Sequence, residues 1–314
     1  MTTEEAVRLM KNILYNVERV IIGKRNAITL MINALACGGH VLIEDVPGVG
    51  KTSLAASLAK SVACSFRRIQ FTPDIMPSDI TGFSVYDPKS GEFVFKPGAV
   101  VTQFLLADEI NRTSPKTQSS LLEAMEEQQV TVDGKSYPVP SPFMVIATQN
   151  PVEYLGTFAL PEAQLDRFFM KITLGYPNAN EESKILGRFQ TGDPLKELAP
   201  VAGGSEVIEL QKLTEQVHVE KSLKDYIVEL IRYTREQDEV GLGASPRASI
   251  NLFKAAQARA LFNAREYVIP DDIIEMAPHV LEHRLRLKQE ARLRKITALD
   301  IIERAARSVG MPAI

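Results

Sequence analysis

The sequence has few cysteines, little net charge and no long apolar run, and each absence excludes a class of protein. Its 314 residues include only two cysteines, Cys37 and Cys64, so a disulfide framework is not expected. The formal net charge of -3 gives no overall attraction to nucleic acid or to an anionic membrane. No run of about 18 apolar residues is uninterrupted, and the N-terminus lacks a basic start with an apolar core. We therefore expect a cytoplasmic protein that does not insert into a membrane.

The order of apolar segments predicts an α/β fold followed by helices. Short apolar runs alternate with helical stretches up to residue 176, which is typical of a parallel sheet covered by helices. The five expected strands cover residues 40–44, 66–71, 104–108, 143–148 and 168–174. Residues 177–314 contain no comparable apolar strand and read as helices. We therefore expect an α/β domain over 1–176 and a helical domain over 177–314.

Two hairpins interrupt this alternation. Residues 83–95 form short alternating strands around a Pro-containing turn, and residues 130–137 do so around Asp133-Gly134. Neither hairpin is needed to complete a five-stranded sheet. They either project as contact surfaces for a partner or are additions of the kind that surface loops tolerate.

A glycine-rich loop lies between the first expected strand and a helix, and this context favours a phosphate site. Glycines let the backbone curl so that several N–H groups point inward toward phosphate oxygens. Lys51 adds a positive charge for the outer phosphates, and the Thr52 hydroxyl can ligate Mg²⁺. The strict pattern begins with Gly where this chain has Asp45, and the alternative is an ordinary glycine turn followed by Lys-Thr. The phosphate-binding candidates are Asp45, Val46, Pro47, Gly48, Val49, Gly50, Lys51, Thr52 and Ser53.

Two carboxylates follow the apolar run 104–107, at the edge of the sheet where open α/β folds bind ligands. Asp108 is expected to hold Mg²⁺ through its water shell, and Glu109 to orient and polarise an attacking water. Acids that cap the next helix are the alternative, although residues 113–115 already supply a cap. The pair becomes a strong signal when it is combined with the glycine loop.

Three further polar residues fit a nucleotide site less specifically. Asn150 ends another apolar strand and could bind the γ-phosphate or position water, but alone it reads as an Asn-Pro turn. Arg167 follows Asp166, and such a pair is usually a surface ion pair. Arg247 falls in the first turn of a helix, where the macrodipole disfavours a cation, so it suggests an anionic partner such as phosphate. Val20 and Ile21 could pack against an adenine ring or simply form an inter-helix turn.

Five segments, taken in order, closely resemble the MoxR family of AAA+ ATPases over nearly the whole chain. They are residues 45–52 (Walker A), 107–112 (Walker B), 147–151 (sensor 1), 160–168 (arginine-finger region) and 245–247 (sensor 2). The hairpin at 83–95 resembles the helix-2 insert of that family, and the hairpin at 130–137 resembles the insert before sensor 1. The resemblance implies an AAA+ five-stranded sheet with a C-terminal helical lid.

The same resemblance implies a ring, commonly hexameric, that binds ATP or ADP with Mg²⁺ between subunits. Arg167 would then act on the γ-phosphate of a neighbour, and Arg247 would sense the nucleotide of its own subunit. Val20 and Ile21 would border the adenine.

MoxR-like proteins often act with von Willebrand factor A domain proteins in assembly or metal-cofactor maturation, so protein remodelling is the leading hypothesis. A DNA motor and a nucleotide-gated scaffold with little turnover are the alternatives. The basic run 283–288 has no interleaved aromatic residues, so we interpret it as a solvated helical face and do not expect nucleic acid binding.

Overall fold

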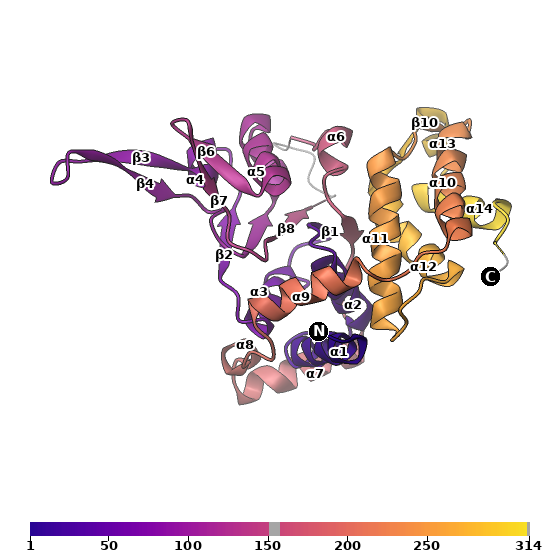
Figure 1. Ribbon diagram of the computed structural model, residues 1–314, viewed down its shortest axis with the longest axis horizontal. Helices are drawn as coiled ribbons and strands as arrows, with labels where there is room; N and C mark the ends of the chain where they lie inside the picture. Colours follow the sequence, from indigo (N-terminus) through magenta and orange to yellow (C-terminus); the bar gives the residue numbers. More distant parts are fainter. Residues whose placement is uncertain (151–157, 313–314) are drawn as a thin grey trace.

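The computed structural model describes residues 1–150 and 158–312, and its centre is a five-stranded parallel sheet (Figure 1). The strand order is β2-β5-β8-β1-β9. The bounds are β1 Val41–Glu44, β2 Phe66–Gln70, β5 Phe104–Asp108, β8 Met144–Gln149 and β9 Met170–Ile172. The five-stranded parallel sheet is confirmed, but β9 is shorter than the predicted strand at both ends, because residues 168 and 169 lie in the bend before it and residues 173 and 174 already follow it.

Both faces of the sheet are covered, which explains the near-continuous apolar character of its inner strands. One face packs on α1 Thr3–Glu18, α2 Arg25–Ala36 and α3 Lys51–Ser61, while the other packs on α5 Pro115–Glu127. Alternation decides which residue faces which layer: Leu106 belongs to the first core, whereas Leu105 and Ala107 belong to the second. The short helices α4 Pro77–Thr81 and α6 Glu162–Leu165 and the 3-10 turn η1 Ile110–Arg112 complete this part of the chain.

The C-terminal part is mainly helical, and its helices lie in two places. The first group, α7 Ala179–Thr191, α8 Pro194–Glu197 and α9 Gly204–Thr214, lies beside α1, α2 and α3 (Figure 1). The second group comprises α10 Lys221–Glu236, α11 Pro246–Phe262, α12 Pro270–Leu281, η2 Glu282–Arg284, α13 Gln289–Leu293 and α14 Ala298–Ser308. In this second group α11 also packs on α1 and α2, so one apolar core continues past residue 176. The boundary placed there stays a prediction.

The helical part differs from the sequence expectation in one detail. Two short strands, β10 Val240–Leu242 and β11 Arg286–Leu287, pair antiparallel within it. The basic run 283–288 therefore begins in a 3-10 turn and continues into a strand, and α12 already ends at Leu281.

Both predicted hairpins are present. The first pairs β3 Gly82–Asp87 with β4 Glu92–Pro97 and extends far from the body of the molecule (Figure 1). The second pairs β6 Gln129–Val132 with β7 Lys135–Pro138. Phe95 stacks on Tyr137 with ring centroids 3.9 Å apart, so the bases of the two hairpins contact each other.

Candidate functional site

The glycine loop joins β1 to α3, as the sequence predicted. Gly48 and Gly50 have φ angles of 84° and 94°, in the left-handed region that favours glycine. Open space surrounds both positions, so the backbone conformation rather than crowding requires glycine there. Gly50 is the N-cap of α3 and provides no side-chain cap, which leaves the helix N-terminus suited to an anion.

Asp45, the residue that departs from the strict pattern, has a structural role in this fold. Its buried carboxylate accepts hydrogen bonds from the backbone N–H groups of Leu174 and Gly175, both at 2.6 Å, through Oδ2. Its Oδ1 accepts a third from the backbone of Val46 at 2.8 Å. The side chain therefore connects the start of the glycine loop to the segment that follows β9.

Lys51 lies among the acidic residues of the candidate site. Its Nζ donates to the backbone carbonyl of Asp45 at 2.7 Å. Partial burial lowers the pKa of this ammonium, while the nearby carboxylates of Asp108, Asp45 and Glu109 act in the opposite direction. The glycine loop and the two acids at the end of β5 thus face each other, as their positions in a parallel sheet predict.

Asp108 and Glu109 are held by partners that the sequence analysis missed. The Thr148 hydroxyl donates to Asp108 Oδ1 at 2.6 Å and accepts from the Glu109 backbone N–H at 2.9 Å. Arg68 on the neighbouring strand β2 binds Asp108 Oδ2 with an Nη2–O distance of 2.7 Å. Register explains both contacts, since β5 pairs with β2 on one side and β8 on the other. The sequence does not reveal the order of the strands in the sheet, so it cannot indicate the contacts of Thr148 and Arg68 with these acids.

Glu109 adopts an uncommon backbone conformation. Its φ angle is 56°, which costs a non-glycine residue about 1 kcal/mol or more. Its carboxylate accepts from Gln70 at 2.7 Å and pairs with Arg112 at 3.0 Å. Such strain is concentrated at functional sites, where the surrounding structure fixes one geometry.

Asn150 directly follows β8 and is buried between the ends of β5 and β1. This is the position expected for a residue that contacts the outer phosphate. Pro151, the last residue of the sensor 1 segment, lies outside the described residues.

Val20 and Ile21 lie beside the glycine loop. They line a pocket together with Gly48, Gly50 and Ser53. Sequence reasoning missed the opposite wall of this pocket, which is formed by Pro177, Ile185, Asp193, Pro194 and Leu195 around α7 and α8. The apolar walls and the adjacent helix N-terminus suit a base next to a phosphate chain.

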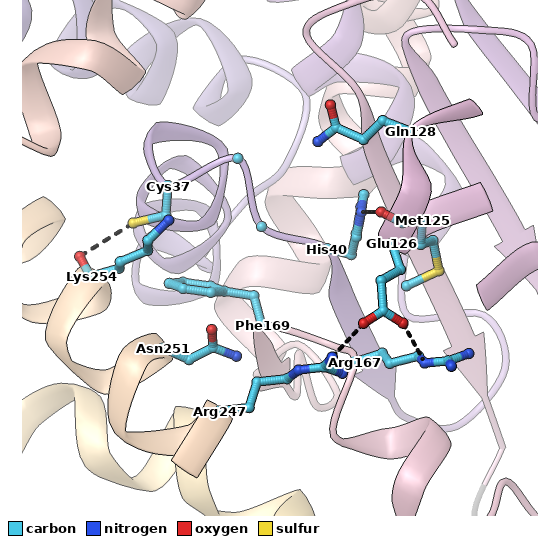
Figure 2. A pocket seen from close by; sticks show the side chains of 12 residues that line it. Cys37, His40, Met125, Glu126, Gln128, Arg167, Phe169, Arg247, Asn251 and Lys254 are labelled. Atoms are coloured by element: carbon cyan, nitrogen blue, oxygen red, sulfur yellow. Dashed lines mark hydrogen bonds and ion pairs between the residues drawn. The ribbon is translucent and has the colours of Figure 1, made fainter. Parts of the chain in front are cut away.

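Arg167 and Arg247 lie together near the N-terminal ends of the sheet strands, whereas the glycine loop lies at their C-terminal ends. They line a pocket whose wall includes His40 before β1 and Phe169 before β9 (Figure 2). These residues precede the strands, whereas the glycine loop follows β1, so the length of β1 separates the two places. This placement differs from the expected role of Arg247 as a sensor within its own subunit, because residues of α7 and α8 line the pocket beside the glycine loop.

Both arginines pair with Glu126 of α5. Glu126 Oε2 lies 3.0 Å from Arg167 Nε, and Oε1 contacts Arg247 Nη2 (Figure 2). The anionic partner that Arg247 was expected to have is thus, within this chain, a carboxylate. Nothing in the sequence pattern indicates this contact, since Glu126 is 121 residues from Arg247.

The segment that carries Arg167 is held by a buried ion pair. Arg284, whose side chain is 1% exposed, binds Asp166 Oδ1 at 2.8 Å and the carbonyl of Phe168 at 2.5 Å. Burial lowers the pKa of this guanidinium to about 10, against the opposing effect of Asp166. Ser245, the N-cap of α11, donates to the same carboxylate at 2.8 Å. The interpretation of residues 283–288 as a solvated helical face is therefore wrong for the buried Arg284, and the neighbouring His283 is only partly exposed.

Residues 1–150 and 158–312 contain neither a membrane-spanning helix nor a cluster of acidic, His and Cys side chains placed to hold a metal ion. No helix there is long and apolar enough to cross a membrane. Within the same residues no group of three or more His, Cys, Asp or Glu side chains is arranged to hold a metal ion.

Comparison with known proteins places this geometry in a family. Residues 40–170 match the ATPase family associated with various cellular activities (AAA), and residues 232–305 match the AAA lid domain. The protein YeaC of Bacillus subtilis is 50% identical over 98% of this chain and 97% of its own length. The chaperone MoxR1 of Mycobacterium tuberculosis is 41% identical over 98% of this chain and 84% of its own.

A crystal structure of a Cytophaga hutchinsonii protein has a TM-score of 0.92 and 40% identity, covering 99% of this chain and 97% of that one. The AAA match spans the glycine loop, both acids and Asn150, and the second match spans Arg247. With relatives of this similarity along almost its entire length, the chain belongs to the MoxR family of AAA+ ATPases.

Proposed function

We propose that this protein hydrolyses ATP as a subunit of a ring, commonly hexameric, in which each nucleotide is bound between two copies. One observation carries the proposal: the glycine loop lies at the C-terminal ends of the sheet strands and Arg167 at their N-terminal ends. One copy therefore cannot bring both to a single nucleotide. A neighbouring copy that presents its Arg167 and Arg247 to the glycine loop of this copy completes the site.

The roles of the residues follow from their chemistry. The loop N–H groups and Lys51 hold the phosphates, and Asn150 binds the outer phosphate or positions the attacking water. Glu109 orients that water and polarises it. The arginines of the neighbour stabilise the charge that develops on the transferred phosphoryl group, a contribution that can reach ~10³ to 10⁵ in rate. An isolated copy should therefore hydrolyse ATP slowly.

The residues present fit a magnesium ion. Mg²⁺ prefers hard oxygen ligands, and the site offers the Thr52 hydroxyl at the start of α3 and the Asp108 carboxylate at the end of β5. Bound there with ATP, the ion would neutralise charge on the outer phosphates. Thr148 fixes the orientation of the Asp108 carboxylate for this role.

The work done by the cycle is proposed to be the remodelling, assembly or maturation of protein complexes. The β3–β4 hairpin supports a protein partner because it exposes apolar side chains, with Phe93 72% and Tyr86 53% exposed. The name of the relative chaperone MoxR1 agrees with this class of activity. A von Willebrand factor A domain protein as partner and a cytoplasmic location remain predictions. Burial of Arg284 removes one cation of the basic run 283–288 from any contact with nucleic acid, so this run offers little support for the DNA-motor alternative.

Two variants and their mixture test the proposal. Glu109→Gln should bind ATP with little turnover, and Arg167→Ala should lower turnover by about 10³ while an isolated copy still binds nucleotide. Mixing the two should restore activity, because an Arg167→Ala copy can receive the arginine of a Glu109→Gln neighbour. Steady-state phosphate release, measured across protein concentrations, gives the readout. Undiminished hydrolysis by Arg167→Ala would refute the shared site, and absence of turnover in the wild type would favour the scaffold alternative.

A further inference from the structure

Glu126 and Arg247 each occupy a helix end that disfavours their charge. Glu126 is in the last turn of α5, where the partial negative charge of the helix end repels a carboxylate. Arg247 is in the first turn of α11, where the partial positive charge repels a guanidinium. Neither placement helps its own helix. The two side chains instead contact each other, and Glu126 also binds Arg167 (Figure 2).

The carboxylate of Glu126 divides its two oxygens between the two arginines. Oε2 pairs with Nε of Arg167, and Oε1 pairs with Nη2 of Arg247 (Figure 2). A guanidinium carries five N–H donors, so each arginine keeps most of its donors available. The three side chains are 32%, 38% and 41% exposed for Arg167, Glu126 and Arg247 respectively, and they line one pocket.

The charges of this trio leave it able to bind a further anion. Two guanidinium groups and one carboxylate sum to a positive charge, whereas Lys254, which lines the same pocket, lies 3.8 Å from the carboxylate of Glu215 and adds little to it. Without the shared carboxylate, two like charges at this separation would repel each other and turn apart. With it, both can face a polyphosphate while Glu126 stays in place.

We propose that Glu126 is a positioning residue that holds Arg167 and Arg247 as one unit directed at the same phosphate chain on a neighbouring copy. The inference rests on the proposed function, because it assigns the way in which the arginine half of the shared site is organised. Glu126 does not touch the substrate. It acts through the two arginines, and both therefore serve the neighbour rather than their own subunit.

The primary experiment compares Glu126→Gln with Glu127→Gln as a matched control. Glu127 is the next residue of α5, is exposed and makes no ion pair with the described residues, so its substitution removes the same charge without touching the arginines. We expect Glu126→Gln to lower kcat about tenfold and to leave KM for ATP within about twofold, because the nucleotide is bound by the other copy. Glu127→Gln should match the wild type in both constants.

Combining Glu126→Gln with substitutions of both arginines separates a positioning role from a general structural effect. If Glu126 acts through Arg167 and Arg247, removing both arginines removes what it positions. The triple variant Glu126→Gln, Arg167→Ala, Arg247→Ala should therefore be no slower than the double arginine variant, whereas an independent effect would multiply. Glu126→Asp, which retains the charge but shortens the side chain, should fall between Glu126→Gln and the wild type.

The mixture experiment adds a test of direction. Glu126→Gln copies mixed with Glu109→Gln copies should recover turnover, since an altered copy then receives intact arginines from its neighbour. Faster turnover by Glu126→Gln would show that the carboxylate restrains the arginines and would overturn the proposal, as would rates equal to those of Glu127→Gln. If Arg167→Ala itself keeps full activity, the proposed function, an ATP site shared between copies, is refuted. This result differs from those that refute only the positioning role of Glu126, so the two outcomes can be told apart.

Discussion

Replacing Asp45 with Gly would restore the strict phosphate-loop pattern, yet the structure predicts that the protein would lose stability. The Asp45 carboxylate accepts three backbone hydrogen bonds, two of them from the segment after β9. Bonds to a charged acceptor contribute about 1.5 to 3 kcal/mol each, and the buried N–H of Leu174 would be left without its partner. Gly also adds backbone freedom to the unfolded chain, which lowers stability further.

We therefore expect Asp45→Gly to lower the free energy of unfolding by about 3 to 6 kcal/mol, counting the two longer-range bonds. Asp45→Asn keeps a neutral acceptor in the same place and should lose about 1 to 2 kcal/mol. Urea denaturation followed by circular dichroism measures both changes. An Asp45→Gly protein as stable as the wild type would refute the structural role assigned to this carboxylate. Stronger ATP binding by that variant, at unchanged stability, would show that the loop prefers the strict pattern.

Three other predictions concern residues outside the phosphate loop. Arg284→Met should lower the free energy of unfolding by about 3 to 5 kcal/mol, since it leaves the Asp166 carboxylate without its buried partner; a loss below about 1 kcal/mol would contradict this. Burial lowers the pKa of His40 to about 4, so the unfolded chain binds a proton first and stability should fall as pH drops from about 6.5 to 4. His40→Gln should flatten that pH dependence in denaturation curves, and an identical slope would exclude the residue as its source. Phe93→Ser should change stability by no more than about 0.5 kcal/mol and leave basal ATPase activity intact, while reducing capture of a protein client by the Glu109→Gln variant.

Local patterns in the sequence predicted the parts of the fold that depend on near neighbours. The strands, the glycine loop and both hairpins follow from alternation, turn residues and helix starts, all of which act over a few positions. Asp108 and Glu109 could be found because they directly follow an apolar strand. Asn150 could be found for the same reason.

Contacts between distant segments could not be predicted in this way. Asp45 binds backbone groups 129 and 130 residues away, and its side chain offers no local signal of that partner. Arg284 belongs to a basic run that resembles a solvated face, but the packing of η2 against the turn before β9 buries it. The position of Arg247 depends on how α11 packs on α1 and α2. Helical periodicity does not specify whether the start of α11 lies near the N-terminal or the C-terminal ends of the sheet strands.

Strand β1 has a mechanical consequence for any ring built from this protein. Its four residues span about 13 Å, with the glycine loop at one end and the wall of the arginine pocket at the other. In the proposed ring, a shift of the loop on nucleotide binding or release would be transmitted along β1 to the wall of the pocket that holds Arg167 and Arg247. Consecutive sites would then be connected in series, and hydrolysis at one interface would set the timing of the next.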